Sequence, residues 1–203
     1  MPRVAGQVDI AKSEAMLDAA SQVIAERGVG APVEAIARRA GVSKQTLYNR
    51  YGGKAGLIQA LIRRRIDSLT APLAGGADGA APEAVLAAFA RDLMTAMLTP
   101  TSLAMTRMAI QGAVDMPGIA EAVFDGGARV SRARLADYLR AESAAGRLAV
   151  DNPAEAADLF SGMVGARQLG ALMGAPAPAD ADTLDRLSRE IARRFVRAYG
   201  VGA

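Results

Sequence analysis

One short run of the chain concentrates side chains that form hydrogen bonds or carry positive charge. Its members are Ser43, Lys44, Gln45, Thr46, Tyr48, Asn49 and Arg50. Lysine and arginine neutralise phosphates, and the hydroxyl group of tyrosine or threonine can bind a phosphate oxygen. Glutamine and asparagine can pair bidentately with the edge of an adenine. This combination of residue types is suited to a groove of a nucleic acid.

The residues around this run predict two short helices joined by a tight turn. The first helix, expected over residues 33–40, supports a recognition helix expected over residues 44–51. Gly41 in the turn is expected to take a positive φ, and the Ser43 hydroxyl is expected to cap the recognition helix. Such a pair is the sequence form of a helix-turn-helix. The alternative, a solvated face of an ordinary helical hairpin, is disfavoured because the turn, the cap and the inward Leu47 agree.

The rest of the chain predicts further helices and no strand. Apolar residues recur at spacings of three and four, and glycines and prolines mark the ends of these patterns. The sequence therefore predicts an all-α fold of about nine helices, with a three-helix head followed by a helical C-terminal domain. The additional helices are expected at about residues 9–27, 54–73, 82–98, 101–114, 117–145, 153–173 and 180–199.

The composition removes much of the usual chemistry of enzymes. The chain has 203 residues and contains neither histidine nor cysteine. It therefore lacks the commonest general base, the commonest metal ligand and any thiolate nucleophile. An enzyme that uses only carboxylates is an alternative, but no paired carboxylates stand out from the expected helix surfaces. We expect no catalytic residue, no metal site and no cofactor.

Positive charge is concentrated near the N-terminus. Residues 1–70 contain eleven Lys and Arg against six Asp and Glu, whereas residues 71–203 contain thirteen against fifteen. This asymmetry indicates an anionic partner at the N-terminal end, although uneven surface charge alone could also produce it. No apolar run has the length of a membrane span, and the first ten residues lack a signal-peptide core. We therefore expect no membrane partner and a cytoplasmic location.

Residues 9–57 resemble the DNA-binding region of the tetracycline-repressor-like (TetR/AcrR) family of transcriptional regulators. The resemblance rests on the stretches LDAASQVIAERG and VEAIARRAGVSKQTLYNRYGGKAGL. This motif is long, and it is far more specific than a generic helix-turn-helix match. Farther along, the stretch LRAESAAGRLAVDNPAEAADLFSGMV is similar to the C-terminal domains of an AefR-like subgroup.

The resemblance implies a homodimer that binds a palindromic operator in double-stranded DNA and releases it when a small-molecule effector binds. It implies a DNA-binding domain over residues 1–56 and an effector-binding and dimerisation domain over residues 57–203. The polar run described above maps onto the recognition helix, and Lys54 maps onto a basic residue that contacts a phosphate. The alternative function is a small-molecule binding protein with a vestigial DNA-binding head.

A few positions depart from the family pattern. Ala31 and Pro32 stand where a Thr or Ser hydroxyl usually binds phosphate, so that interaction is either absent or supplied by the helix N-terminus itself. Arg50 replaces a frequent His, and Gly53 replaces a common Ser cap. These departures affect the expected contacts with DNA and leave the expected fold unchanged.

The C-terminal part is rich in methionine, whose flexible side chain suits an irregular apolar pocket. We expect a pocket for a small, largely apolar effector, and the alternative is that the same residues form ordinary core. The expected lining residues are Met94, Met97, Met105, Met108, Phe124, Phe160 and Met163.

Small residues recur every four positions between residues 162 and 174. A glycine inside a helix costs about 1 kcal/mol relative to alanine, and close approach of another helix would compensate for that cost. We therefore expect a dimer interface here, completed by the apolar face of the last helix; the alternative is close packing within one chain. The expected interface residues are Gly162, Ala166, Gly170, Leu184, Leu187, Ile191 and Phe195.

Overall fold

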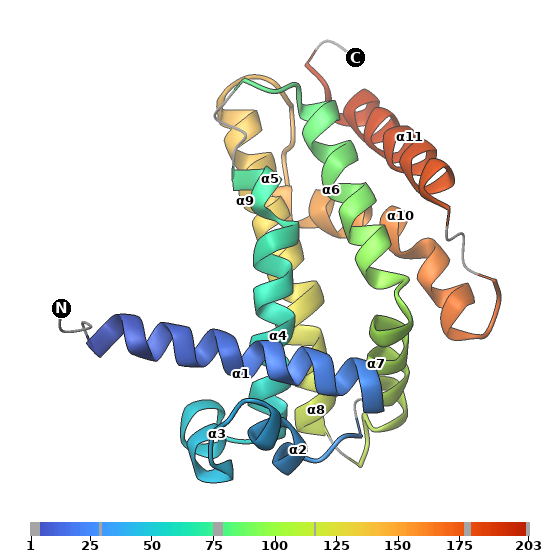
Figure 1. The fold of residues 1–203 in the computed structure, drawn as a ribbon. Helices are drawn as coiled ribbons and strands as arrows, with labels where there is room; N and C mark the ends of the chain where they lie inside the picture. Colours follow the sequence, from blue (N-terminus) through green and yellow to red (C-terminus); the bar gives the residue numbers. More distant parts are fainter. Residues whose placement is uncertain (1–4, 29, 75–78, 116, 177–179, 202–203) are drawn as a thin grey trace. The chain divides into compact units, whose positions relative to one another are not determined.

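The computed structural model describes residues 5–28, 30–74, 79–115, 117–176 and 180–201, and in these ranges the fold is all-α, as predicted (Figure 1). The one β contact among the described residues is an isolated bridge between Leu148 and Gly200. The helices are α1 (Ala5–Arg27), α2 (Val33–Arg39), α3 (Lys44–Tyr51), α4 (Lys54–Leu69), α5 (Ala71–Ala74), α6 (Pro82–Met97), α7 (Pro100–Gln111), α8 (Pro117–Phe124), the π-helical turn η2 (Asp125–Arg129), α9 (Val130–Ala144), α10 (Pro153–Leu172) and α11 (Ala181–Tyr199).

The helices pack as two compact units. The first comprises Met1–Arg64 and Ala104–Gly126, and the second comprises Arg65–Leu103 and Gly127–Ala203. The predicted domain boundary after residue 56 stays a prediction, because these packing units do not follow a single point along the chain. No helix in the described ranges is both long enough and apolar enough to cross a membrane.

The core of the first unit gathers apolar side chains from α1 to α4. Met16 and Val23 of α1 cluster with Ile36 of α2, Leu47 of α3 and Leu57 of α4, and none of the five is more than 2% exposed. Burying a large aliphatic side chain contributes roughly 1.5–3 kcal/mol to stability. Helices α2 and α3 have only seven and eight residues, and helices this short are not stable by themselves. The packing of this cluster therefore holds both helices in place.

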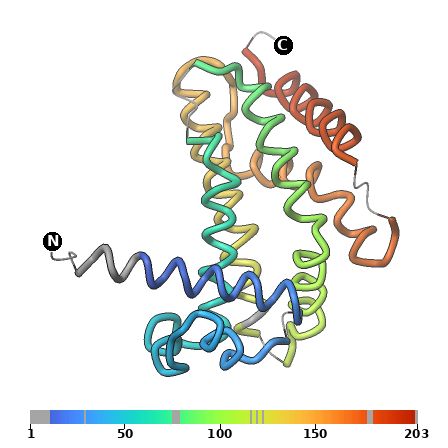
Figure 2. The backbone as a smooth tube through the Cα atoms, in the orientation of Figure 1, coloured from blue at the N-terminus to red at the C-terminus, as the bar shows by residue number. Residues whose placement is uncertain are grey.

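The core of the second unit is built around aromatic rings from α6, α10 and α11. The rings of Phe89 and Phe160 stack with centroids 6.1 Å apart, and Phe160 meets Phe195 edge to face at 5.1 Å. Phe195 in turn contacts Tyr199 at 4.7 Å. In this unit α6 and α11 lie side by side, and α10 packs against α9 (Figure 2). All three phenylalanines are at most 2% exposed, so they anchor these helices to one another.

A charge pair between a buried carboxylate and an exposed arginine closes the turn after α9. Glu142 is 1% exposed and accepts hydrogen bonds from Nε and Nη2 of Arg147, at 2.6 and 2.7 Å. A buried carboxylate needs such a bidentate partner to offset the loss of its hydration. The segment that follows fixes the end of the chain, because the N–H of Ala149 donates to the carbonyl of Tyr199 at 2.7 Å.

The predicted helix over residues 54–73 is wrong at its C-terminal end. The helix ends at Leu69, and a separate short helix, α5, begins at Ala71. Pro72 explains the break, because proline lacks an N–H and its ring clashes with the preceding helical turn, whereas the first turn of a new helix tolerates it. At the junction the hydroxyl of Thr70 donates to the carbonyl of Ile66 at 2.7 Å and accepts from Arg134 at 2.6 Å.

The predicted single helix over residues 117–145 is also wrong, because η2 interrupts it between α8 and α9. This π-helical turn contains Gly126 and Gly127, which have low helix propensity. Gly126 is buried, and a Cβ at this position would lie 3.1 Å from the carbonyl oxygen of Gln59 in α4. A side chain at this position would force a shift of a few tenths of an ångström, so the close approach of α4 favours a glycine here.

Candidate nucleic-acid interface

The turn between α2 and α3 is a Schellman motif, and it sets the direction of the recognition helix. The N–H of Val42 donates to the carbonyl of Ala37 at 3.0 Å, and the N–H of Gly41 donates to the carbonyl of Arg38 at 3.3 Å. Gly41 has φ +66°, which confirms the predicted positive φ. A side chain at this position would strain the backbone, so the glycine is required by the turn itself.

Ser43 caps α3, as predicted. Its Oγ accepts a hydrogen bond from the N–H of Thr46 at 3.0 Å, and the two hydroxyl oxygens lie 2.8 Å apart. At the other end, Gly52 stops the helix with φ +70°, and its N–H donates to the carbonyl of Tyr48 at 2.8 Å. The sequence thus defines both ends of an eight-residue helix that is too short to form by itself.

One side chain anchors α3, and the polar ones face outward. Leu47 is 2% exposed and is the only buried residue of α3, which is described over its full length. All seven members of the predicted DNA-contacting run are exposed: Ser43, Lys44, Gln45, Thr46, Tyr48, Asn49 and Arg50. The structure therefore brings them together on one accessible helix, and their contacts with DNA stay a prediction.

Lys44 forms an ion pair with a carboxylate that was not predicted from the sequence. Its Nζ lies 2.5 Å from Oε1 of Glu34 in α2 and 5.5 Å from the centre of the Tyr48 ring. The hydrogen bond between the two charged groups raises the pKa of Lys44 and lowers the pKa of Glu34. Exposed ion pairs of this kind contribute only about 0–1 kcal/mol. Exchanging Glu34 for a phosphate is therefore inexpensive for Lys44.

Gln45 and Asn49 form an amide pair one helical turn apart. Nε2 of Gln45 donates to Oδ1 of Asn49 at 2.7 Å. This bond uses one donor and one acceptor, and it leaves Oε1 of Gln45 and the amino group of Asn49 available for other partners. An amide presented in this way has the donor and acceptor pattern that adenine requires.

Lys54 begins α4, directly after the glycine pair that ends α3. Its side chain is partly buried, and burial lowers the pKa of its amino group from the usual value. No carboxylate in the described part of the chain forms an ion pair with it. Lys54 thus has its N–H donors available for an anion, as the phosphate-binding prediction requires.

Contacts between α1 and the helix-turn-helix hold the recognition helix in place. Arg39 of α2 donates to both carboxylate oxygens of Glu26 in α1, at 2.9 and 2.8 Å, and also to Gln22 at 3.2 Å. The hydroxyl of Tyr51 donates to the carbonyl of Ser13 at 3.3 Å. Neither contact was predicted, because residues this far apart in the sequence give no local pattern that pairs them.

The start of α2 lacks the Ser or Thr hydroxyl that is usual in the family pattern. Pro32 is the N-cap and makes no side-chain hydrogen bond, and Ala31 before it is buried at 4% exposure. The backbone N–H groups of the first turn therefore have no side-chain hydroxyl beside them. Any phosphate bound here would be held by the helix N-terminus.

The seven residues predicted to line an effector pocket are divided between the two units. In the second unit, Met94 and Phe160 are part of the buried core, Met97 packs against that core, and Met163 is 37% exposed. In the first unit, the other three lie elsewhere: Met105 and Met108 pack around Ile24 and Ile58, and Phe124 is 47% exposed. Neither of the two cavities described in the structure is lined by any of the seven.

The residues predicted at the dimer interface also fall into two groups. On α10, Gly162 and Ala166 are exposed and Gly170 is partly buried. On α11, Leu184 and Phe195 are 5% and 2% exposed and lie in the core of their own chain, and their place in an interface stays a prediction.

The other two predicted interface residues of α11 also pack within their own chain. Leu187 and Ile191 are partly buried and pack against that core. The apolar face of α11 thus faces α6 within the same chain, which leaves the exposed part of α10 as the remaining candidate.

A polar helix face held in this way by α1 and α2 is the construction of a helix-turn-helix DNA-binding regulator. A family model described as "Bacterial regulatory proteins, tetR family" matches residues 16–61. A second model, "AefR-like transcriptional repressor, C-terminal domain", matches residues 84–201, which is more than half of the chain. The chain belongs to the TetR family, and its class is that of transcriptional regulators, not enzymes.

Solved structures of the same family share the fold over almost the whole chain. A protein assigned to the TetR family from Mesorhizobium loti MAFF303099 is 23% identical with a TM-score of 0.77, covering 95% of this chain and 98% of that one. A TetR transcriptional regulator from Agrobacterium tumefaciens is 25% identical with a TM-score of 0.71, covering 94% and 95%. The Flavonoid-responsive Regulator FrrA is 26% identical with a TM-score of 0.64, covering 95% and 99%. A search of curated proteins gives no match.

Lys54→Gln is expected to weaken binding to all DNA sequences about equally, because a phosphate contact positions the protein without reading bases. The plot of log K against log salt concentration should become shallower by roughly one unit for each phosphate that the protein no longer neutralises. Fluorescence anisotropy over a salt series measures this slope. Lys12→Gln, an exposed lysine of α1, is the control for removal of one charge in the same unit. An unchanged slope in Lys54→Gln would remove this residue from the interface.

Proposed function

We propose that the chain is a homodimeric repressor that binds a palindromic operator through α3 and leaves it when a small, largely apolar effector binds. The observation that carries the DNA-binding part is the capped, outward-facing recognition helix. Its proposed contacts are Ser43, Lys44, Gln45, Thr46, Tyr48, Asn49, Arg50 and Lys54. The proposed place of action is the cytoplasm, where a DNA partner would be met.

The division of roles follows residue type and position. Lys44, Tyr48 and Lys54 would bind phosphates, and the amide pair Gln45 and Asn49 would read base edges. Gln45 lies in the first turn of α3, and the N-terminal residues of a recognition helix contact bases in the major groove. Sequence preference is therefore assigned to this end of the helix.

Gln45→Ala is expected to relax the preference at one or two base pairs per half-site, at a cost of about 1–3 kcal/mol for a good bidentate contact. The measurement is a selection from randomised duplex DNA with the wild type and the variant in parallel. Arg63→Gln, an exposed arginine of α4 outside α3, is the control and should return the wild-type motif. Identical motifs for wild type and Gln45→Ala would contradict the assignment, and no enriched motif for the wild type would contradict operator recognition.

Effector release is proposed from the second unit, with Met94, Met97 and Phe160 as lining residues. Cε of Met97 lies 3.7 Å from the position of a Cβ at Gly165, so a flexible side chain packs against α10 at a position without a side chain of its own. The relative FrrA is described as flavonoid-responsive, which makes a flavonoid a suitable first probe. The test titrates flavonoids and other small aromatic compounds against the complex with selected DNA. Release of DNA supports repression by this route, and loss of response in Met97→Glu would place the site.

A further inference from the structure

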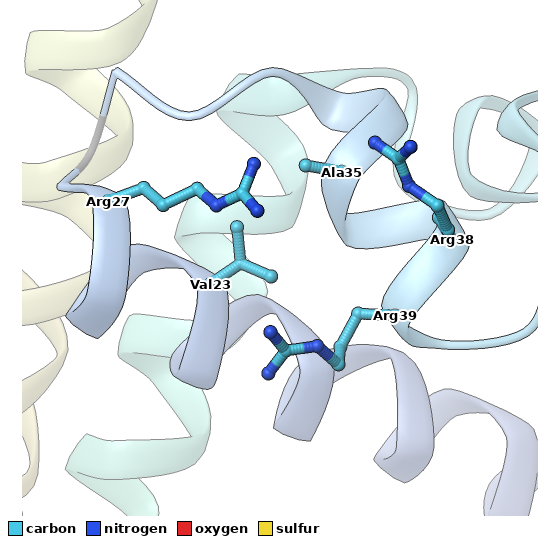
Figure 3. A pocket seen from close by; sticks show the side chains of 5 residues that line it. All are labelled: Val23, Arg27, Ala35, Arg38 and Arg39. Atoms are coloured by element: carbon cyan, nitrogen blue, oxygen red, sulfur yellow. The ribbon is translucent and has the colours of Figure 1, made fainter.

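A pocket in the first unit is lined by arginines that the proposed DNA contacts do not use. Its volume is about 450 Å³, and its lining comes from two helices (Figure 3). Arg27 and Val23 belong to α1, whereas Ala35, Arg38 and Arg39 belong to α2. Figure 3 shows the side chain of Arg27 extending from the end of α1 across Val23 toward α2, where Ala35 lies between it and the side chain of Arg38.

The three arginines differ in how their charges are balanced. Arg39 is bound to Glu26 and Gln22, and this bond joins the two walls of the pocket. Arg27 and Arg38 form no ion pair within the described residues, although the charge of Arg27 slightly lowers the pKa of Glu26 beyond the larger effect of Arg39. Two guanidinium groups with ten N–H donors thus line one pocket, and neither is neutralised by an ion pair within the described residues.

The floor of the pocket is apolar and buried. Val23 is 2% exposed and Ala35 is 6% exposed, so neither side chain offers an acceptor to the guanidinium groups above them. Both arginines stand in the last turn of a helix, where a cation is favoured by the carbonyl end of the helix dipole. The helix dipole accounts for a positive charge at each position, but it does not explain why both charges line the same pocket.

We propose that Arg27 and Arg38 bind a phosphate-type oxyanion between them. Planar guanidinium groups bind phosphate oxygens bidentately, and the pocket has space for such a group. The anion is either a phosphate of the DNA backbone or free phosphate from solution. The first source rests on the proposed DNA-binding function, and the second does not depend on it.

The variants Arg27→Gln and Arg38→Gln, alone and combined, test the site in the full-length chain. Arg63→Gln removes one charge from an exposed position of α4 without altering the pocket and is the matched control. The glutamine variants should fold, because both arginines are exposed and no described ion pair is removed. Circular dichroism is measured on each variant to check this.

The first arm measures binding to a mixed-sequence duplex of about 40 base pairs over a salt series, because the phosphate contribution is independent of sequence. If the anion is a backbone phosphate, the salt slope falls by about one unit in the combined variant and by less in Arg63→Gln. If the wild-type chain does not bind the duplex, this result contradicts the proposed DNA-binding function. The anion site is then tested by the phosphate measurement of the second arm alone.

The second arm measures thermal unfolding with inorganic phosphate against chloride at equal ionic strength. If free phosphate binds, saturation raises the Tm of the wild type and of Arg63→Gln by roughly 2–4 °C, and the combined variant loses this shift. Either response supports the anion site and identifies its source. Equal salt slopes together with equal phosphate shifts in wild type and combined variant overturn it.

Discussion

Leu47→Ala is expected to abolish operator binding by loosening the first unit. Leu47 is 2% exposed and is the single buried side chain that attaches α3 to the core formed by α1, α2 and α4. Truncating a buried leucine to alanine costs about 2–5 kcal/mol, because transfer free energy is lost and a cavity remains. An eight-residue helix is too short to hold its position without such packing, and its other contacts, the partly buried ring of Tyr51 and the hydrogen bond of Tyr51 to Ser13, lie at its C-terminal end.

Thermal and urea unfolding monitored by circular dichroism would measure the loss of stability, and fluorescence anisotropy would measure the loss of DNA binding. Ile110→Ala is a suitable control, because Ile110 lies in the same unit and is 62% exposed. The control should change the free energy of unfolding by less than about 0.5 kcal/mol. A Leu47→Ala variant that unfolds like the wild type and binds DNA normally would contradict the proposed anchoring of α3.

The local signals in the sequence were sufficient for the helix-turn-helix. The positive φ of Gly41 and the capping bond of Ser43 depend on residues within a few positions, and both were predicted correctly. The same is true of the all-α fold, because apolar spacing is a local property. The break of α4 was also readable in principle, since Pro72 lies inside the helix that was predicted too long.

The contacts that the sequence could not supply join residues far apart in the chain. The pairing of Arg39 with Glu26 and of Lys44 with Glu34 depends on how α1, α2 and α3 pack, and no spacing rule specifies it. The apolar face of α11 illustrates the same limit. Periodicity predicted an apolar stripe there, but periodicity alone does not tell whether the stripe meets its own chain or a partner.

A face of α10 is left uncovered by the residues that the structure describes. Exposed apolar and small residues recur at helical spacing along this face, which extends to the C-cap residue Met173: Leu159, Gly162, Met163, Ala166, Leu169 and Met173. Leu169 and Met173 are 64% and 80% exposed, which is high for apolar residues that recur on one helix face. A single recognition helix reads few base pairs, so operator binding requires a second copy. We propose that this face of α10 meets its symmetry mate.

Gly162→Leu combined with Gly170→Leu is expected to convert the dimer to monomer and to abolish operator binding. A Cβ at Gly162 would meet nothing within 4 Å in the same chain, and at Gly170 it would meet only Cβ of Ala175 at 3.7 Å. The protomer therefore accommodates both side chains, and leucine has a higher helix propensity than glycine. Any defect must come from a partner that approaches closely.

Overpacking costs about 1–3 kcal/mol per site, and two-fold symmetry places each substitution twice in the interface. Dimerisation should therefore weaken by roughly a thousandfold or more, while helical content is kept. Sedimentation at micromolar concentration measures the change. Gly118→Leu is the matched control, since a Cβ there also meets nothing within 4 Å and the residue lies on α8, in the first unit. If the double variant stayed dimeric and still bound DNA, the interface would have to lie on another exposed apolar surface, such as that of Ile110 and Val114.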